Sequence, residues 1–323
     1  MKVGILGAGA TGGFLGVRLA KAGADVVLIA RGPHLRAMTE TGLRLIEPDG
    51  ETTLRVNASD DLRTLRGVDA VFVTLKAHSV PAIAERLAAN LRADAAVVSA
   101  QNGIPWWYFQ RHGGELEGTH LETVDPGGLV ARAINPERVI ACIVYPATSV
   151  VGPGVVRHLE GEKFSLGELD GKPTPRIQAL ASLLVSAGLK APVQSRIRQE
   201  LWVKLMGNAV FNPMSVLTRA SLGAMAESPE LSHIVRAAME EVGTVAQRLG
   251  IEMPVTIDQR IRGAARVGDH KTSMLQDLES GRPLEIDAVA GSVVELAGRL
   301  GVPVPHLETM YGCVKVLATT SVS

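Results

Sequence analysis

The sequence predicts an α/β protein in which a doubly wound parallel sheet is followed by a second, all-helical domain. In the first half, short apolar runs alternate with helical patterns, and a glycine cluster follows the first run directly. After about Ser195, long amphipathic segments replace this alternation. Alternating strands and helices are typical of parallel sheets, whose strands are buried on both faces. Because 323 residues exceed the usual size of one core, we expect two domains, at residues 1–195 and 196–323.

The apolar runs of the first half predict the strands of the sheet, and the segments between them predict its helices. Strands are expected at residues 3–6, 26–29, 70–75 and 95–99, and helices at 14–22 and 80–90. Glycine and proline turns then separate three shorter runs, which predicts an antiparallel extension of the same sheet. These runs are residues 139–144, 155–159 and 163–166, and a last helix and strand are expected at 173–187 and 191–194.

Prolines divide the second half into helical segments. Because proline begins or ends a helix more readily than it continues one, breaks are expected at residues 212–213, 228–229, 253–254, 282–283 and 303–305. The segments between these breaks carry apolar residues at helical spacing. The second domain is therefore predicted to be all helical, and its apolar faces favour a homodimer.

The composition excludes several classes of function. The 33 basic and 33 acidic side chains balance, and Lys and Arg form no cluster, so neither a nucleic acid nor a membrane is an expected partner. Cys142 and Cys313 form no zinc or disulfide pattern and the eight histidines lack ligand spacing, so no metal is expected. No apolar run reaches the roughly 20 residues of a spanning helix, and no signal peptide precedes the first strand. We expect a cytoplasmic protein with a small-molecule partner.

The first predicted strand runs into Gly7-Ala8-Gly9-Ala10-Thr11-Gly12, which opens the first predicted helix. This is the context of the GxGxxG motif of Rossmann-like dinucleotide-binding domains. Gly7 permits the tight turn, Gly9 lets the backbone approach a pyrophosphate, and Gly12 lets helix and strand pack. The helix N-terminus offers free N–H groups to the anion. A merely glycine-rich turn is the alternative, but the context favours a cofactor site formed by these six residues.

The second predicted strand leads to Arg31, where an NAD-binding domain usually carries an acidic residue for the ribose 2′-hydroxyl. Asp25 lies too early, at the start of that strand. A guanidinium suits the 2′-phosphate of NADP, and a charge-assisted hydrogen bond of this kind contributes about 1.5 to 3 kcal/mol. The sequence therefore predicts NADP as the cofactor, with an exposed loop arginine as the alternative.

Two further strand ends place polar groups at the same edge of the sheet, where ligands of open α/β sheets bind. Lys76 follows Thr74-Leu75 and could neutralise a phosphate. Asn102, which precedes Gly103, could hydrogen-bond the nicotinamide ribose or the substrate. A solvated lysine and an ordinary Asn-Gly turn explain these residues equally well.

One helix of the second half, residues 200–212, is apolar around most of its circumference. Its polar residues Glu200, Lys204 and Asn208 are four apart and share one stripe, and Asn212 is expected to end the helix before the next proline. A lysine recessed among apolar neighbours can give up a proton. Reduction of a carbonyl needs such a donor, because hydride transfer leaves an alkoxide. We predict Lys204 as the general acid, with Asn208 and Asn212 orienting the substrate.

Ser273 and Glu285 are further candidates, each with an ordinary structural alternative. Ser273 with Gln276 fits an N-cap and capping box, yet a serine at a helix N-terminus can also bind a substrate carboxylate. Glu285, two residues after Pro283, is a favourable charge in a first helical turn, a partner for Lys204, or a ligand of a ribose hydroxyl.

Over essentially its full length, the chain resembles the ketopantoate reductase (2-dehydropantoate 2-reductase) family. The resemblance rests on GAGATGG, the strand end at Arg31, TLKA, QNG, LWVKLMGNAVFNP and SMLQDLESGRPLEID. It implies NADPH-dependent reduction of a 2-oxo acid, with Lys204 as proton donor and with Asn208 and Asn212 facing the substrate. The other roles that it implies are binding of the substrate carboxylate by Ser273 and cofactor contact by Lys76, Asn102, Ala147 and Glu285.

Two departures from the family pattern leave the substrate open. Residues 218–223 lack a further substrate-facing asparagine that some members carry, and His270 stands where an asparagine can occur. Ketopantoate is the expected substrate. The alternatives are another branched or aromatic 2-oxo acid, a β-hydroxyacid substrate, and an NADP-binding regulator without turnover.

Overall fold

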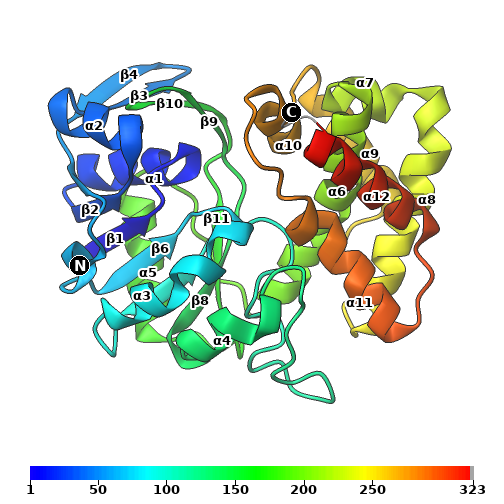
Figure 1. Ribbon diagram of the computed structural model, residues 1–323, viewed down its shortest axis with the longest axis horizontal. Helices are drawn as coiled ribbons and strands as arrows, with labels where there is room; N and C mark the ends of the chain where they lie inside the picture. The colour runs from blue at the N-terminus through cyan, green and yellow to red at the C-terminus, as the bar shows by residue number, and fades with distance from the viewer. Residues whose placement is uncertain (321–323) are drawn as a thin grey trace. The chain divides into compact units, whose positions relative to one another are not determined.

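The structure, a computed structural model, describes residues 1–320 and divides the chain into two compact units (Figure 1). The first unit consists of Met1–Gln101, Phe109–Thr119 and Leu129–Ile197. The second consists of Asn102–Tyr108, His120–Gly128 and the chain from Arg198 onward. Two short segments of the first half of the sequence therefore belong to the second unit.

The first unit contains a seven-stranded sheet in the order β11-β8-β7-β6-β1-β2-β5. Neighbouring strands are parallel, except that β11 runs antiparallel to β8. The strands are β1 (Lys2–Leu6), β2 (Asp25–Ile29), β5 (Asn57–Ser59), β6 (Ala70–Val73), β7 (Ala96–Ser99), β8 (Val139–Val144) and β11 (Phe164–Glu168). Most are buried runs of Val, Ile and Ala, as a sheet covered on both faces requires. The predicted doubly wound sheet is confirmed.

A second sheet in the same unit has the order β4-β3-β10-β9. Its strands are β3 (Leu43–Glu47), β4 (Gly50–Leu54), β9 (Ala147–Gly152) and β10 (Val155–Glu160). The expectation that residues 155–159 extend the large sheet is wrong, because β10 pairs antiparallel with β9 and parallel with β3. The buried side chains of β10 lie against α1 (Ala10–Lys21): His158 stacks on Phe14 with 4.3 Å between ring centroids.

Helices and short turns complete the first unit. The helices after α1 are α2 (Gly32–Glu40), α3 (Ala84–Ala89), α4 (Leu129–Ala133) and α5 (Pro175–Ser186). The 3-10 turns are η1 (Leu62–Leu65), η2 (Ala77–Ser79), η3 (Pro81–Ile83) and η5 (Pro136–Arg138), with η4 (Pro126–Gly128) in the second unit. The helix expected at 80–90 begins only at Ala84, after η2 and η3, and the strand expected at 191–194 is reduced to isolated bridges of Lys190 and Val193.

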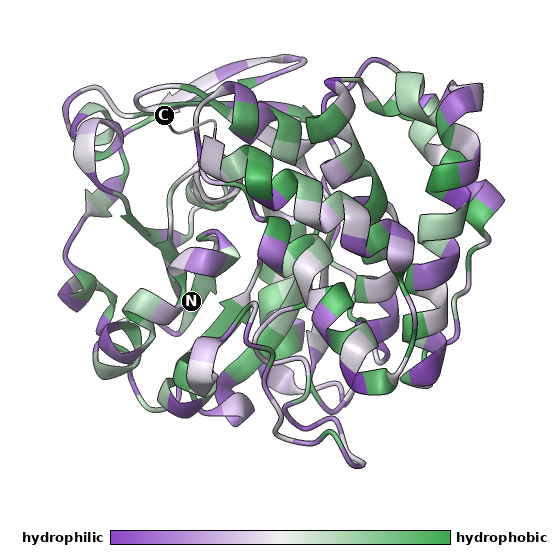
Figure 2. Cartoon of the chain, turned by 45° about the vertical axis from the view of Figure 1, so that its right-hand side comes forward, coloured by the Kyte–Doolittle hydropathy of each residue, from purple (hydrophilic) through white to green (hydrophobic). Residues whose placement is uncertain are grey.

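Helices make up most of the second unit, as predicted. They are α6 (Ile197–Thr218), α7 (Leu222–Glu227), α8 (Pro229–Arg248), α9 (Ile257–Val267), α10 (Ser273–Glu279), α11 (Ser292–Leu300) and α12 (Pro305–Thr320), with a π-helical turn η6 (Asp287–Gly291) before α11. Apolar and polar residues alternate along these helices in Figure 2. Within residues 1–320, no helix combines the length and the apolar character that crossing a membrane requires.

The expectation that Asn212 ends its helix is wrong, because α6 continues through Pro213 to Thr218. Proline in a helix interior removes one backbone hydrogen bond and disfavours the α conformation of the preceding residue. Tertiary packing outweighs this cost here: the side chains from Ala209 to Val216 are buried, and Ser215 Oγ donates a 2.7 Å hydrogen bond to the carbonyl oxygen of Asn212.

Candidate active site

The glycine turn between β1 and α1 has the geometry that its sequence predicts. Gly7 has a φ of +105°, in the region that favours glycine. A Cβ at Gly12 would overlap the carbonyl oxygen of Gly7 and lie 2.5 Å from Thr74 Oγ1, so only glycine fits there. A Cβ at Gly9 would meet no atom within 4 Å. The turn is therefore closed against the sheet at Gly7 and Gly12 and open above Gly9.

The N-terminus of α1 fits an anionic ligand. Its N-cap, Gly9, supplies no side-chain hydrogen bond, and the first turn contains no acidic residue. The first backbone N–H groups of a helix lack partners within the helix, and the helix dipole makes this end positive. A pyrophosphate above Gly9 would meet these groups without a competing side chain. This arrangement is what a dinucleotide site on this fold needs.

Arg31 is the N-cap of α2 and its side chain is exposed. Among residues 1–320, no acidic group forms an ion pair with its guanidinium. Two other predicted cofactor contacts also lie in the first unit: Lys76 follows β6 as the half-buried N-cap of η2, and Ala147 begins β9, a strand that contacts α1. Asn102 belongs to the second unit.

In the second unit, the structure brings together three predicted site residues that are far apart in the sequence. Lys204 Nζ donates a 2.7 Å hydrogen bond to Asn102 Oδ1. Asn102 Nδ2 donates a longer hydrogen bond, 3.5 Å, to Glu285 Oε2. All three side chains are half-buried. The neutral amide of Asn102 thus links a cation on α6 with an anion that immediately precedes the helical turn at residues 286–291.

Backbone contacts with η6 fix the position of Asn102. The N–H of Ile104 donates a 3.0 Å hydrogen bond to the carbonyl oxygen of Ala288. Gly103 has a φ of +82°, and a Cβ at this position would overlap the same oxygen. Glycine is therefore required at position 103 for a second reason, the close approach of Ala288. The sequence does not reveal this contact, because it depends on the tertiary fold.

Aromatic side chains hold the far end of this segment on α6. Trp202 Nε1 donates a 2.7 Å hydrogen bond to Tyr108 Oη, and both rings are buried. Arg198 Nε donates a 2.8 Å hydrogen bond to the backbone oxygen of Tyr108. Burial raises the pKa of Tyr108 to about 12, so its hydroxyl stays neutral. The helix that carries Lys204 thus also anchors the segment that carries its hydrogen-bond partner.

The remaining predicted substrate residues lie along α6 and at the start of α10. Asn208 is half-buried, and Asn212 is buried with 6% of its surface exposed. The expectation of an N-cap and capping box at Ser273 is wrong, because Thr272 is the N-cap and its hydroxyl accepts a hydrogen bond from the N–H of Leu275. Ser273 is the exposed first residue of α10.

Sequence reasoning missed the buried pair that joins α6 to α10. The hydroxyls of Ser215 and Thr272 are 2.5 Å apart, and both side chains are buried. Since Ser215 also donates to the carbonyl oxygen of Asn212, this pair connects the substrate candidates of α6 with the beginning of α10. Thr272 itself had a detectable signal, because threonine is a favoured N-cap.

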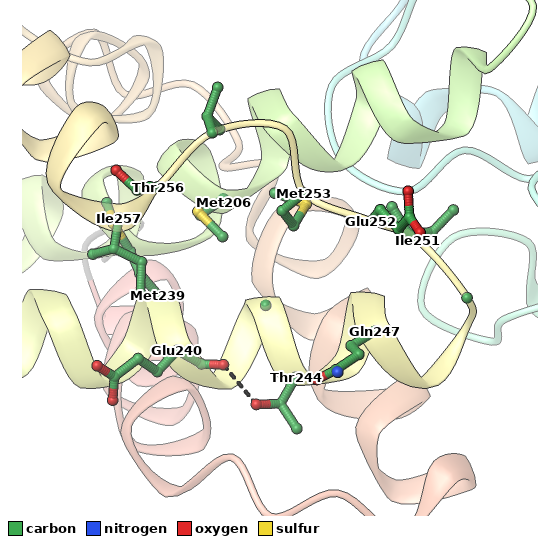
Figure 3. Close-up of a pocket in the computed structure, with 13 residues that line it drawn as sticks. Met206, Met239, Glu240, Thr244, Gln247, Ile251, Glu252, Met253, Thr256 and Ile257 are labelled. Carbon is green, nitrogen blue, oxygen red and sulfur yellow. Dashed lines mark hydrogen bonds between the residues drawn. The ribbon is translucent and has the colours of Figure 1, made fainter.

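A pocket of about 610 Å³ lies elsewhere in the second unit, between α8, the loop at residues 250–256 and one side of α6 (Figure 3). Met206, Met239 and Met253 supply much of its apolar lining, and Glu240 and Glu252 stand among its polar residues. None of the predicted site residues lines it. Met206 alone connects the pocket with the helix of Lys204.

Comparisons with known proteins agree with this geometry. The family model "Ketopantoate reductase PanE/ApbA" matches residues 3–171, and "Ketopantoate reductase PanE/ApbA C terminal" matches residues 196–318. A 2-dehydropantoate 2-reductase from Mesorhizobium japonicum is 47% identical over 319 residues, 98% of each chain. The crystal structure of a PanE/ApbA family ketopantoate reductase from Ralstonia eutropha JMP134 is 30% identical, with a TM-score of 0.86 over 99% of each chain. D-mandelate dehydrogenase, in a ternary structure with NADH and anilino(oxo)acetate, is 21% identical and shares the fold, with a TM-score of 0.86 over 99% of each chain.

Proposed function

Because the chain belongs to the ketopantoate reductase family and is an oxidoreductase acting on CH–OH groups, we propose that it reduces a 2-oxo acid, ketopantoate, with NADPH. The product would be the corresponding 2-hydroxy acid, pantoate. The observation that carries the proposal is the hydrogen bond from Lys204 to Asn102, which holds an ammonium group at a fixed place on a largely apolar helix.

Lys204 would act as the general acid. Hydride addition to a ketone leaves negative charge on oxygen, and an ammonium group can donate both a hydrogen bond and a proton to that oxygen. Lys204 donates to Asn102, and an ammonium group has three N–H donors, so it can bond several acceptors at once. The substrate oxygen would be one of them.

Asn208, Asn212 and Ser273 would orient the substrate. Asn208 lies one helical turn from Lys204, and Asn212 lies two turns away, so amide groups follow the ammonium along one stripe of α6. Ser273 lies at the start of α10, which the Thr272–Ser215 pair joins to α6 near Asn212. A hydroxyl at a helix start suits a carboxylate. The arrangement would bind a short 2-oxo acid by both of its oxygen-bearing groups.

The glycine turn and Arg31 would hold the dinucleotide, whose nicotinamide supplies the hydride when it is bound. The uncapped N-terminus of α1 would receive the pyrophosphate. Arg31 would bind the 2′-phosphate, because its guanidinium is exposed at the end of the second strand and has no acidic partner among residues 1–320. Lys76, Ala147, Asn102 and Glu285 stay candidate cofactor contacts.

The test is a kinetic assay with purified protein. NADPH oxidation would be followed with ketopantoate and a panel of branched and aromatic 2-oxo acids, each also with NADH. We expect the highest kcat/KM for ketopantoate with NADPH. No turnover of any oxo acid with either cofactor would contradict an enzymatic role and would favour a non-catalytic, NADP-binding regulator.

One observation favours a different 2-oxo acid as second candidate. The two sequence departures at residues 218–223 and His270 meet in the structure, because the N–H of Leu222 donates a 2.9 Å hydrogen bond to the carbonyl oxygen of His270. A local change in both segments could alter which substrate side chain fits. A higher kcat/KM for another branched or aromatic oxo acid in the panel would support this alternative. A homodimer stays a prediction, which light scattering after gel filtration would check.

A further inference from the structure

His34 connects the glycine turn with the second sheet of the first unit. It lies on α2, three residues after Arg31. Its Nε2 is 2.8 Å from the carbonyl oxygen of Ala8, and its Nδ1 is 3.0 Å from the backbone nitrogen of Gly154, in the turn between β9 and β10. The N–H of Gly154 can only donate and the oxygen of Ala8 can only accept. Nδ1 of His34 therefore accepts from Gly154, and Nε2 donates to Ala8.

The contact with Ala8 completes a set of hydrogen bonds that holds both peptide groups of the turn at both ends. In the Gly7–Ala8 peptide, the oxygen accepts from Thr74 Oγ1 at 2.7 Å and the N–H donates to the oxygen of Ile29 at 2.9 Å. In the Ala8–Gly9 peptide, the N–H donates to the oxygen of Gly7 at 2.7 Å, and the oxygen accepts from His34. His34 is thus the side chain that fixes the second of these peptides.

The second peptide has the greater need of such a fixing group. Gly9 has no side chain, and a Cβ there would meet no atom within 4 Å, so no side chain at Gly9 restrains the Ala8–Gly9 peptide. This peptide immediately precedes the helix whose first N–H groups would meet the pyrophosphate. If the turn had to become ordered when the cofactor binds, the loss of conformational entropy would lower the affinity for the cofactor. A turn that is ordered in advance avoids this cost.

The far side of His34 is itself anchored. The backbone oxygen of Gly154 accepts a 2.8 Å hydrogen bond from the N–H of Arg44 on β3, and α2 leaves no room for a side chain at Gly154, because a Cβ there would lie 2.8 Å from Ala37 Cβ. The second sheet therefore supports the imidazole of His34, and the imidazole in turn holds the carbonyl group of Ala8 in the glycine turn.

We propose that His34 is a positioning residue that holds the glycine turn ready for the pyrophosphate of the dinucleotide. The inference rests on the proposed function, because it concerns the same cofactor site. The hydrogen bond from Nε2 to Ala8 serves cofactor binding, whereas the hydrogen bond at Nδ1 supports the imidazole ring.

Three substitutions separate these two bonds. His34→Gln places an amide NH2 within reach of the Nε2 position and can keep the bond to Ala8, whereas His34→Asn has its polar atoms near the Nδ1 position and can keep only the bond from Gly154. His34→Ala loses both. The dissociation constant of NADPH would be measured from its fluorescence, together with KM for NADPH and kcat. Thr39→Ala is the control, since its exposed hydroxyl bonds only within the same helix.

We expect His34→Ala and His34→Asn to weaken NADPH binding roughly tenfold, and His34→Gln to stay within about threefold of the wild type. At saturating NADPH, kcat should stay within about twofold of the wild type in all three variants. The Gln and Asn variants each lose one hydrogen bond, so their melting temperatures should fall by similar amounts. A difference in NADPH affinity between them therefore cannot be explained by a difference in stability. Equal affinity of the Gln and Asn variants, or wild-type affinity of the Ala variant, would overturn the inference. Absence of NADPH binding by the wild type would instead refute the proposed function.

Discussion

The ammonium group of Lys204 donates a 2.7 Å hydrogen bond to the side-chain oxygen of Asn102, although the two residues are 102 positions apart in the chain. The same amide donates from its nitrogen to Glu285. The oxygen of the amide thus faces the cation and its nitrogen faces the anion, which is the orientation that both partners favour. The hydrogen bond to this neutral amide helps to hold the ammonium group of Lys204 in place.

Lys204→Met tests the role of the ammonium group. Methionine keeps most of the apolar length of the side chain but cannot donate a proton, so we expect turnover to fall about 100- to 10,000-fold, the usual share of a general acid. The affinity for NADPH should change little, because the glycine turn is untouched. Steady-state kinetics and NADPH titration measure the two effects. Lys190→Met is the matched control, since 76% of that side chain is exposed in the first unit. Near-normal turnover of Lys204→Met would refute the assignment.

Arg31→Asp tests how the cofactor is selected. A carboxylate at this position would repel the 2′-phosphate of NADPH and accept hydrogen bonds from the 2′-hydroxyl of NADH. We expect the ratio of kcat/KM for the two cofactors to move toward NADH by one to two powers of ten, roughly the contribution of a charge-assisted hydrogen bond. Arg36→Asp makes the same charge change at an exposed position on the same helix and should leave the ratio unchanged. An unaltered preference in Arg31→Asp would show that another group reads the 2′-phosphate.

Gly103→Ala tests the close approach of the Asn102 segment to η6. Alanine would be strained at a φ of +82°, and its methyl group would overlap the carbonyl oxygen of Ala288. Gly301→Ala is the control, because Gly301 also has a positive φ, +65°, but no atom within 4 Å of its added Cβ. We expect the control to lose about 1 kcal/mol of unfolding free energy and Gly103→Ala to lose about 3 kcal/mol or more. Denaturant unfolding measures both values. Equal losses would mean that the backbone at Gly103 can move away without cost.

The raised pKa of Tyr108 predicts that the folded protein loses stability at alkaline pH. Its pKa is about 12 in the folded protein, and an unfolded tyrosine has a pKa near 10. Between these values the unfolded chain has already lost this proton while the folded chain keeps it, so the unfolding free energy falls as the pH rises from 10 to 12. The total loss from this group is about 2 to 3 kcal/mol. Denaturant unfolding at pH 9, 10 and 11 measures the slope. Tyr108→Phe should reduce it, and an unchanged slope in this variant would assign the effect to other groups.

Much of the fold could be predicted because its signals are local. The first strand, the glycine turn and α1 follow from residues 2–21 alone, and the half-buried position of Lys204 on a largely apolar helix follows from its neighbours. The hairpin of β3 and β4 also has a local signal, an alternating run followed by Pro48-Asp49-Gly50. The pairing of β10 with β3 had none, because it joins strands more than a hundred residues apart.

The parts of the site that could not be predicted depend on packing. Nothing near Pro213 indicates that buried neighbours hold the helix together through the proline, and nothing near Gly103 indicates that Ala288 will approach it. Sequence reasoning found Asn102, Lys204 and Glu285 one by one but left the partner of Glu285 open. The structure shows Asn102 as one such partner, because its amide contacts both Glu285 and Lys204.

Residues 102–108 and 120–128 belong to the second unit although the surrounding chain belongs to the first, and this matters for the design of chimeric proteins. A hybrid gene that joins two homologous parents at residue 196 would combine the lysine of one parent with the asparagine, glycine and tyrosine of the other. Parents that differ in these few positions would give mismatched hybrids, even if each half were intact. An exchange of the helical half that keeps these contacts must therefore also exchange residues 102–108 and 120–128.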